Sequence, residues 1–304
     1  MVDLRGPSDD KRLVVFEDEQ ASPNHVSLHI DRFEMKFRVS AAQRATLMAR
    51  LAPHLRPDAN AGAGAQYPVV SLYYDNRERD CYWEKARGFP SRRKLRVRVY
   101  GSRDGVVPAT AFIEIKHKCE GRGVKRRVQL PLEQALRVGE GLWPEGSQVP
   151  EIDARVIREV HDMVLRRRFE PVLVMRYDRT AYAAVDPSGD LRMTFDSGVR
   201  VRFDELTPEP DDRRFDTNGG DQDDGGAVME VKVTGCIPYW LTRTIAEAGC
   251  LMQSHSKYSA ALERGDPVLR EMLSPHWHAR PMRAASENPA FSPLSAPTFA
   301  PVAG

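Results

Sequence analysis

Residues 32–39 read Arg-Phe-Glu-Met-Lys-Phe-Arg-Val, a stretch in which charged and apolar side chains alternate without a break. Successive side chains of a β-strand point to opposite faces, so this alternation predicts a strand with one charged face and one apolar face. Similar alternation recurs at residues 94–100, 112–118, 124–130, 191–196 and 228–233. The dominant period of the chain is therefore two, which is typical of strands rather than helices.

From this periodicity we expect an α+β fold with nine strands and three helices. The strands are expected at residues 29–39, 69–75, 92–101, 111–118, 124–130, 172–182, 190–196, 199–203 and 227–233. The helices are expected at residues 41–55, 151–169 and 238–249. Ser40 is a good N-cap for the first helix, and Pro238 suits the first turn of the third.

The charged faces of these strands share an unusual composition. The pattern Glu-x-Lys occurs at residues 34–36, 114–116 and 230–232, and Lys and Arg dominate the charged positions elsewhere. A plain sheet with one solvated face is one explanation, but such a face would mix in Ser, Thr, Gln and Asn. Closing the sheet into a barrel would place the charges inside and leave the apolar face for the helices to cover. We therefore expect a closed antiparallel β-barrel with covering helices and a basic interior that suits a polyanion.

The composition argues against several classes of protein. The 304 residues carry a formal net charge of only +2, so the overall charge does not indicate a nucleic-acid partner. No apolar run approaches the roughly 20 residues that a membrane helix needs, and the N-terminus lacks the apolar core of a secretory signal. Four scattered cysteines form no CxxC pair, so we expect no zinc site and a cytoplasmic location with reduced thiols.

Three segments are expected along the chain. Residues 1–26 are polar and aperiodic and should form a disordered leader, residues 27–264 the folded domain, and residues 265–304 a disordered tail rich in Pro and Ala. Residues 204–226 are rich in Asp and Gly without apolar periodicity, which predicts a long solvated loop. A regulatory segment that competes for the basic interior is the alternative for this stretch.

The expected interior combines many cations with a few carboxylates, which should remain ionised in such surroundings. Carboxylate oxygens are hard ligands that suit Mg²⁺ or Mn²⁺, shared with the oxygens of a bound phosphate. Lys and Arg would hold the remaining phosphates and stabilise charge during phosphoryl transfer. The interior is therefore expected to bind a chain of phosphates together with a divalent metal.

At this point the motifs resemble those of a known family. In chain order they are Glu34-x-Lys36, Lys94-x-Arg96-x-Arg98, Glu114-x-Lys116, residues 177–182 (YDRTAY), Glu230-x-Lys232 and Ser256-Lys257-Tyr258. This ordered set is similar to the VTC domain, the catalytic domain of the vacuolar transporter chaperone polyphosphate polymerase. That domain is one of the CYTH-like triphosphate tunnel metalloenzymes.

The resemblance implies a tunnel of about eight strands, ATP as phosphoryl donor, Mn²⁺ or Mg²⁺, and inorganic polyphosphate as product. Together with the alternation, it predicts catalytic roles for Lys36, Arg96, Arg98, Lys116, Arg179 and Arg192. It predicts phosphate-binding roles for Lys94, Lys125, Arg127, Lys232 and Lys257. The chief metal ligand would be Glu230, with Glu34 and Glu114 as further candidates argued mainly from the side of the strand on which they lie.

One departure bears on the reaction. Hydrolytic tunnel enzymes begin with Glu-x-Glu-x-Lys, whereas Arg32 stands at the first of these positions here. Losing one metal carboxylate favours a polymerase over a two-metal hydrolase. The alternatives are a metal-dependent triphosphate or tripolyphosphate hydrolase and a non-catalytic polyphosphate sensor. The expected partners are ATP and polyphosphate, with no nucleic acid and no membrane segment of the chain's own, and protein partners are left open.

Overall fold

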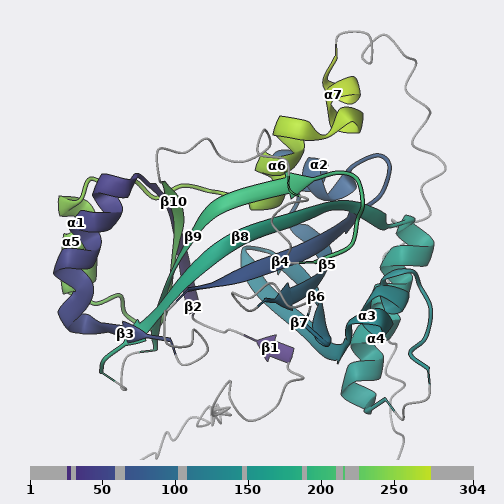
Figure 1. The fold of residues 1–304 in the computed structure, drawn as a ribbon, viewed down its shortest axis with the longest axis horizontal. Helices are drawn as coiled ribbons and strands as arrows, with labels where there is room; N and C mark the ends of the chain where they lie inside the picture. The colour runs from purple at the N-terminus through teal and green to yellow at the C-terminus, as the bar shows by residue number, and fades with distance from the viewer. Residues whose placement is uncertain are drawn as a thin grey trace, which may run out of the picture.

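The computed structural model describes residues 26–28, 32–58, 66–101, 108–145, 149–186, 190–209, 215 and 226–274. Its strands are β1 Val26–Leu28, β2 Arg32–Val39, β3 Leu55–Pro57, β4 Gln66–Asp75, β5 Ser91–Tyr100, β6 Thr110–Cys119, β7 Arg122–Pro131, β8 Glu170–Ala184, β9 Leu191–Arg202 and β10 Ala227–Thr234. Its helices are α1 Ala41–Leu51, the 3₁₀ turn Ala52–His54, α2 Asp80–Ala86, α3 Leu132–Gly139, α4 Glu151–Arg167, α5 Tyr239–Glu247, α6 Lys257–Gly265 and α7 Pro267–Leu273. The α+β class expected from the sequence is confirmed (Figure 1).

The strands form one antiparallel sheet in the order β1-β7-β6-β5-β4-β8-β9-β10-β2, with β3 paired to β8 outside this path. The sheet is strongly curled, because Lys116 Nζ on β6 lies 3.5 Å from Glu34 Oε2 on β2 although five strands separate these two in the sheet order. Curling of this kind makes one face of the sheet concave, and that face carries the alternating charges.

Closure into a complete barrel, expected from the sequence, is not seen in the described part of the chain. There, no ladder joins β2 to β7, and the outer edge of β2 contacts the segment between α5 and α6 instead. Phe37 forms a bridge with Met252, and the Gln253 backbone N–H donates to the Lys36 carbonyl at 2.8 Å. Because this segment satisfies part of that edge, the structure shows a curled half-barrel with an open seam.

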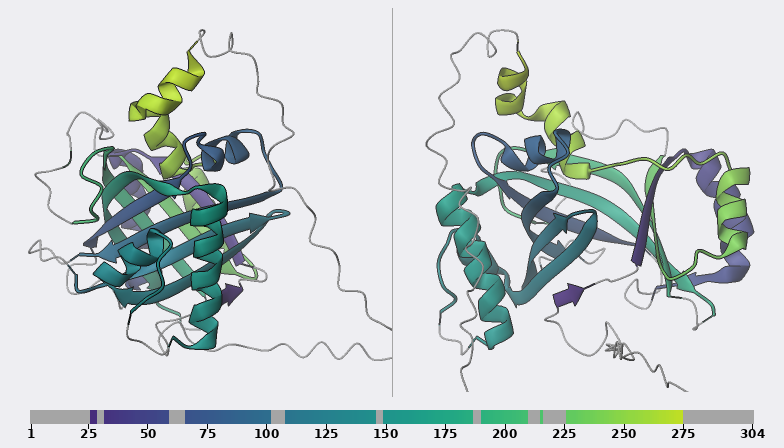
Figure 2. Two further views of the ribbon diagram at one scale, coloured as in Figure 1. Left: turned by 90° about the vertical axis from the view of Figure 1, so that its right-hand side faces the viewer. Right: turned by 180° about the vertical axis from the view of Figure 1, so that it is seen from behind.

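One end of the convex face is covered by α1 and α5, which lie side by side (Figures 1 and 2). Phe37, Met193 and Val231 of the sheet pack here against Leu47 of α1 and Leu241 of α5. These are the apolar positions of the alternating strands, so the pattern read from the sequence is the one that forms this core.

The other half of the sheet packs its apolar face against α3 and α4 (Figures 1 and 2). Val97, Ile113 and Val128 belong to a core with Ile157 and Val160 of α4, and all five side chains are buried. The expectation that helices cover the apolar faces is therefore confirmed, although α3 was not among the helices expected.

Several boundaries differ from the expectation for local reasons. The first helix, expected to reach residue 55, ends at Leu51, because Pro53 follows and the chain turns into β3. A single strand, β9, replaces the two expected at residues 190–196 and 199–203. Gly198 adopts a φ of 60° at an irregularity in the β8–β9 pairing, which keeps the strand continuous where a break was expected. The elements not expected are β1, β3, α2, α3, α6 and α7.

The expected tail needs a correction at its start, because residues 267–273 form α7. Asp266 is buried and caps this helix, and its carboxylate accepts from Arg79 Nε at 2.6 Å. Leu269 and Met272 are also buried, so the ordered domain continues past residue 264. The leader expected at residues 1–26 includes Val26, which instead begins β1. Its residues 1–25, the remainder of the tail at 275–304 and most of the acidic stretch between 204 and 226 lie outside the described residues. Across the described ranges, no helix has the length and apolar character needed to cross a membrane.

Candidate functional site

Cross-strand pairing places the predicted site residues on one face of the sheet. Neighbouring strands bring Arg96 opposite Glu114, Glu230 opposite Lys36, and Lys232 opposite both Arg192 and Glu34. The strand residues that share this concave face are Glu34, Lys36, Lys94, Arg96, Arg98, Glu114, Lys116, Lys125, Arg127, Arg179, Arg192, Glu230 and Lys232. Lys257, the remaining predicted residue, reaches this face from the first turn of α6. The structure therefore brings all fourteen predicted residues to one face.

Glu34 and Glu230 share one cation. Lys36 Nζ lies 3.0 Å from Glu34 Oε1 and 3.6 Å from Glu230 Oε1. Burial acts to raise the pKa of Glu34, but the ammonium groups of Lys116 and Lys36 outweigh it and lower that pKa to about 2. Burial is likewise outweighed at Glu230, where Lys257 and Lys36 hold the pKa well below its usual range. Both carboxylates are therefore ionised at neutral pH.

Glu114 has a different environment. Its carboxylate is 1% exposed, and Oε2 accepts from Arg96 Nε at 2.7 Å with Arg98 Nη1 at 3.7 Å. Arg96 also donates to Tyr73 Oη at 3.2 Å, and Arg98 Nε donates to Ser71 Oγ at 3.1 Å. These contacts fix both guanidinium groups, and they favour a structural role for Glu114 in holding Arg96 and Arg98 on the face.

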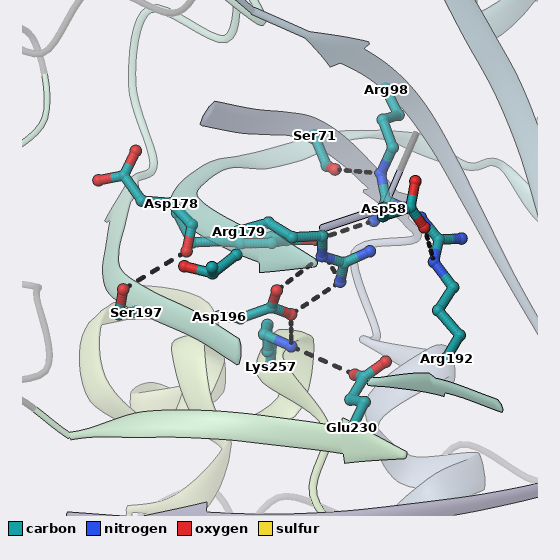
Figure 3. A network of polar contacts seen from close by, with 12 residues as sticks. Asp58, Ser71, Arg98, Asp178, Arg179, Arg192, Asp196, Ser197, Glu230 and Lys257 are labelled. Carbon is teal, nitrogen blue, oxygen red and sulfur yellow. Dashed lines mark hydrogen bonds and ion pairs between the residues drawn. The ribbon is translucent and has the colours of Figure 1, made fainter. Parts of the chain in front are cut away.

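Asp196 lies between Arg179 and Lys257 (Figure 3). Its side chain is fully buried and accepts two bonds from Arg179, from Nε at 2.7 Å and from Nη2 at 2.8 Å. On its other side Lys257 Nζ lies 2.6 Å from Asp196 Oδ2 and 3.3 Å from Glu230 Oε1. Burial acts to lower the pKa of Lys257, but Asp196 and Glu230 raise it overall, so this ammonium is charged at neutral pH. Sequence reasoning did not select Asp196, although its position in the alternation of β9 was the available signal.

A second carboxylate that sequence reasoning missed is Asp58, which follows β3. Its Oδ2 lies 2.8 Å from Arg192 Nε, and Figure 3 shows this pair beside Arg179. The Asp58 backbone N–H donates to the Ala181 carbonyl of β8 at 3.0 Å, which anchors the residue to the sheet. No local pattern in the sequence links residue 58 to residue 192, so only the fold reveals the pair.

The position of Lys257 depends on how α6 is held. Ser256 caps the helix, accepting from the Ser259 backbone N–H at 3.3 Å and from Lys94 Nζ at 3.0 Å. The next residue but one, Tyr258, donates from its buried hydroxyl to Asp75 Oδ2 at 2.6 Å. These contacts tie the first turn of α6 to β4 and β5, and so direct Lys257 toward Asp196 and Glu230.

The cations of the site differ in exposure and in pKa. The Lys116 side chain is 49% exposed, whereas that of Arg98 is 7% exposed, so solvent reaches Lys116 more readily than Arg98. Burial lowers the pKa of Lys232 to about 7 and that of Lys94 to about 8. Burial also lowers the pKa of Lys125. Such lowered pKa values indicate that a bound anion would stabilise the charged form of these lysines.

Positive charge dominates the face as a whole. The predicted residues supply eleven cations, against the carboxylates of Glu34, Glu114, Glu230, Asp196 and Asp58. Among the described residues, no group of three or more His, Cys, Asp or Glu is placed to hold a metal by itself. Chemically, the arrangement can bind several phosphates in a row and can complete a metal site only with oxygens from the ligand.

Comparison with known proteins supports the resemblance drawn from the motifs. A family model described as the VTC domain matches residues 31–264. Among solved structures, a candidate adenylate cyclase from Bacillus halodurans is similar over 78% of this chain and 100% of its own, with 13% identity and a TM-score of 0.42. The triphosphatase of the Mimivirus capping enzyme is similar over 72% of this chain and 86% of its own, with 9% identity and a TM-score of 0.26. No curated protein matches the chain. The family match, which spans more than two thirds of the sequence, shows that the chain belongs to the VTC domain family.

Proposed function

We propose that this VTC domain is a polyphosphate polymerase that transfers the γ-phosphoryl group of ATP to a growing polyphosphate chain. The observation that carries the proposal is the continuous row of cations on the concave face, joined to two ionised carboxylates that share one cation. Phosphoryl transfer needs positioned phosphates and neutralised charge more than a dedicated base, and this face supplies both.

In this proposal, arginine side chains that are already held in place bind the phosphates. Arg96 and Arg98 are two residues apart on β5, so they lie about 7 Å apart along the strand and can contact successive phosphates. Arg179, held by Asp196, presents a third guanidinium from β8. Planar guanidinium groups bind phosphate through two parallel hydrogen bonds, and fixing them beforehand reduces the entropy lost on binding.

A divalent cation fits Glu34 and Glu230. Both are ionised, and both already contact the Lys36 ammonium, so one cation lies between them in this structure. Glu114 does not fit as well, because its side chain is 1% exposed and Arg96 Nη2 holds its Oε2 at 2.6 Å. In the proposal Glu230, with Glu34, would hold Mn²⁺ or Mg²⁺ together with phosphate oxygens, and the metal would neutralise charge on the β- and γ-phosphates.

Arg32 favours a polymerase over a hydrolase. The strand β2 carries Arg32, Glu34 and Lys36, so the position that would hold a further metal carboxylate has a cation instead. A second metal that activates water is then harder to hold, which favours the end of a phosphate chain over water as the nucleophile. Hydrolysis of triphosphate and binding without turnover are the competing functions.

A product analysis separates the three functions. Purified protein would be incubated with ATP and Mn²⁺, with and without a short polyphosphate primer, and products resolved by gel electrophoresis and ³¹P NMR over time. Long chains that appear together with ADP are the expected result. Orthophosphate without chains would establish a hydrolase instead. Tight polyphosphate binding with neither product would leave the sensor.

A further inference from the structure

Three aromatic side chains lie together at one end of the charged face. They are Tyr67 of β4, Tyr100 of β5 and Phe112 of β6, which we call the aromatic end. The ring centroids of Tyr67 and Tyr100 are 6.0 Å apart, and those of Tyr100 and Phe112 are 5.8 Å apart. The rings are tilted or edge-on to one another rather than stacked in parallel, and each side chain remains partly exposed. Each of the three side chains therefore keeps part of its surface open to solvent.

The aromatic end continues the face that carries the cations. Tyr100 is two residues beyond Arg98 on β5, and Phe112 is the direct cross-strand neighbour of Arg98 on β6. On the other side, Tyr67 pairs with Arg179 of β8. Along β5, the concave face thus changes from a guanidinium group at Arg98 to a ring at Tyr100, with Tyr67 and Phe112 on the neighbouring strands.

Arginine side chains of the charged face contact the rings of the aromatic end directly. The Arg98 guanidinium lies 5.9 Å from the centre of the Tyr100 ring, and that of Arg127 lies 4.7 Å from the centre of the Phe112 ring. At the other end of the same face of β5, Lys94 contacts Ser256 of the α6 cap. A ligand that follows β5 would therefore meet rings first, then two arginines, then Lys94 and the turn that carries Lys257.

We propose that the aromatic end binds the nucleobase of a nucleoside triphosphate whose phosphates extend along Arg98 and Arg96. This inference rests on the proposed function, in which a nucleotide is the phosphoryl donor. A nucleoside triphosphate has a planar π-system at one end and an anionic chain at the other, in the same order as the rings and cations here. Along β5, Tyr100 lies about 7 Å from Arg98 and about 13 Å from Arg96, which leaves room for the ribose between base and phosphates.

The rings would distinguish the two ligands of the proposed reaction. Inorganic polyphosphate has no base, so it gains nothing from the rings and needs only the cations. Stacking tolerates any base, because every base has a π-face, so the site is expected to accept nucleoside triphosphates as a class with little selectivity among bases. The aromatic end would therefore favour the donor nucleotide over a free phosphate chain at this end of the face.

The test compares two ligands that differ in the nucleoside. The Kd values of adenosine 5′-(β,γ-imido)triphosphate and of inorganic tripolyphosphate would be measured by calorimetry at one Mn²⁺ concentration. Tyr100→Leu and Phe112→Leu should each raise the Kd of the nucleotide analogue about tenfold, which is the loss expected for a stacked base. The Kd of tripolyphosphate should change less than twofold. Tyr100→Phe keeps the ring and should bind both ligands as the wild type does.

Phe112→Trp, which enlarges the π-system, provides a second variant should the leucine variants fail to fold. It should bind the nucleotide analogue at least as tightly as the wild type, with tripolyphosphate unchanged. Equal weakening of both ligands in the leucine variants would mean that the rings only support Arg98 and Arg127, and would overturn the inference. Unchanged binding of both ligands in those variants would overturn it as well. If the wild-type protein binds tripolyphosphate but not the analogue, only the proposal of a base site is overturned. If it binds neither ligand, the proposed function itself is overturned.

Discussion

Lys257 Nζ lies 2.6 Å from Asp196 Oδ2 and makes a longer contact, of 3.3 Å, with Glu230 Oε1 (Figure 3). The first residue of α6 thus joins carboxylates from two neighbouring strands of the sheet, β9 and β10. Without a bound anion, these carboxylates offset the positive charge of Lys257 and Arg179. A phosphate chain would bring its own negative charge to the same cations, so we expect Asp196 to matter more for the stability of the unliganded domain than for that of the complex.

The first prediction concerns Asp196→Asn. Removing this charge leaves Arg179 and Lys257 without their closest carboxylate, and breaking a buried pair costs about 3–5 kcal/mol. We expect the free energy of unfolding to fall by about 3 kcal/mol, because the amide still offers one acceptor oxygen. Tripolyphosphate should then raise the Tm of the variant more than that of the wild type, since the anion replaces the missing charge. Thermal unfolding with and without the ligand measures both effects.

Asp178→Asn is the matched control. Asp178 lies on the opposite face of β8, with its side chain 28% exposed and its carboxylate 3.4 Å from Arg176 Nη2. Its loss should cost less than about 1 kcal/mol and should leave the ligand effect on Tm at the wild-type level. Equal stabilisation of both variants by tripolyphosphate would contradict the role given to Asp196.

The second prediction tests the proposed metal ligand with Glu230→Gln. We expect turnover to fall at least a hundredfold, because a divalent metal bound as proposed would lose its main protein ligand. Tripolyphosphate affinity should stay within a few-fold of the wild type, because the surrounding cations remain. Initial rates over a Mn²⁺ titration and binding calorimetry give the two values. Glu247→Gln on α5, outside the site, is the control and should keep full activity. Full activity of Glu230→Gln at limiting Mn²⁺ would remove Glu230 from the metal site.

Contacts between charged residues could be predicted from the sequence where they follow from the alternation within a strand. Glu34 and Lys36 share a face because a strand has a period of two, and the same argument placed Glu230 on that face. Tyr258 and Asp75, by contrast, are 183 residues apart and meet only because α6 packs against the end of β4. Whether the sheet closes is equally non-local, because it depends on what contacts the outer edge of β2. Alternation identifies faces, whereas partners from distant segments come from the packing.

The third prediction concerns α7, which sequence composition did not reveal. Ending the chain after residue 264 removes the buried Leu269 and breaks the buried pair of Asp266 and Arg79. Burial of one leucine contributes about 1.5–3 kcal/mol, and breaking a buried pair costs about 3–5 kcal/mol. We expect the shortened chain to lose at least about 4 kcal/mol in urea unfolding. A chain that ends after residue 274 keeps these contacts and is the control. Equal stability of the two chains would restore the boundary at residue 264.

The last prediction concerns pH and Lys94. Burial lowers the pKa of Lys94 to about 8, against the opposing effects of Cys81, Tyr73 and Asp75, with Lys85 adding to the decrease. The ammonium is therefore fully charged below about pH 7 and is lost as the pH rises through 8. Because a phosphate chain favours the charged form, binding above pH 8 should take up a proton at this site.

We expect the Kd for tripolyphosphate to increase between pH 7 and pH 9. Loss of the Lys94 charge should account for about a tenfold increase, which corresponds to the loss of one charge-assisted contact. Lys94→Arg keeps a positive charge throughout this range, so its Kd should change about tenfold less. The ligand's own protonation and the titration of Lys232 are common to both proteins and cancel in the comparison. Calorimetry at pH 8.5 in buffers of different ionisation enthalpy should also show less proton uptake for Lys94→Arg. Identical pH dependence of the two proteins would show that Lys94 does not contact the phosphate chain.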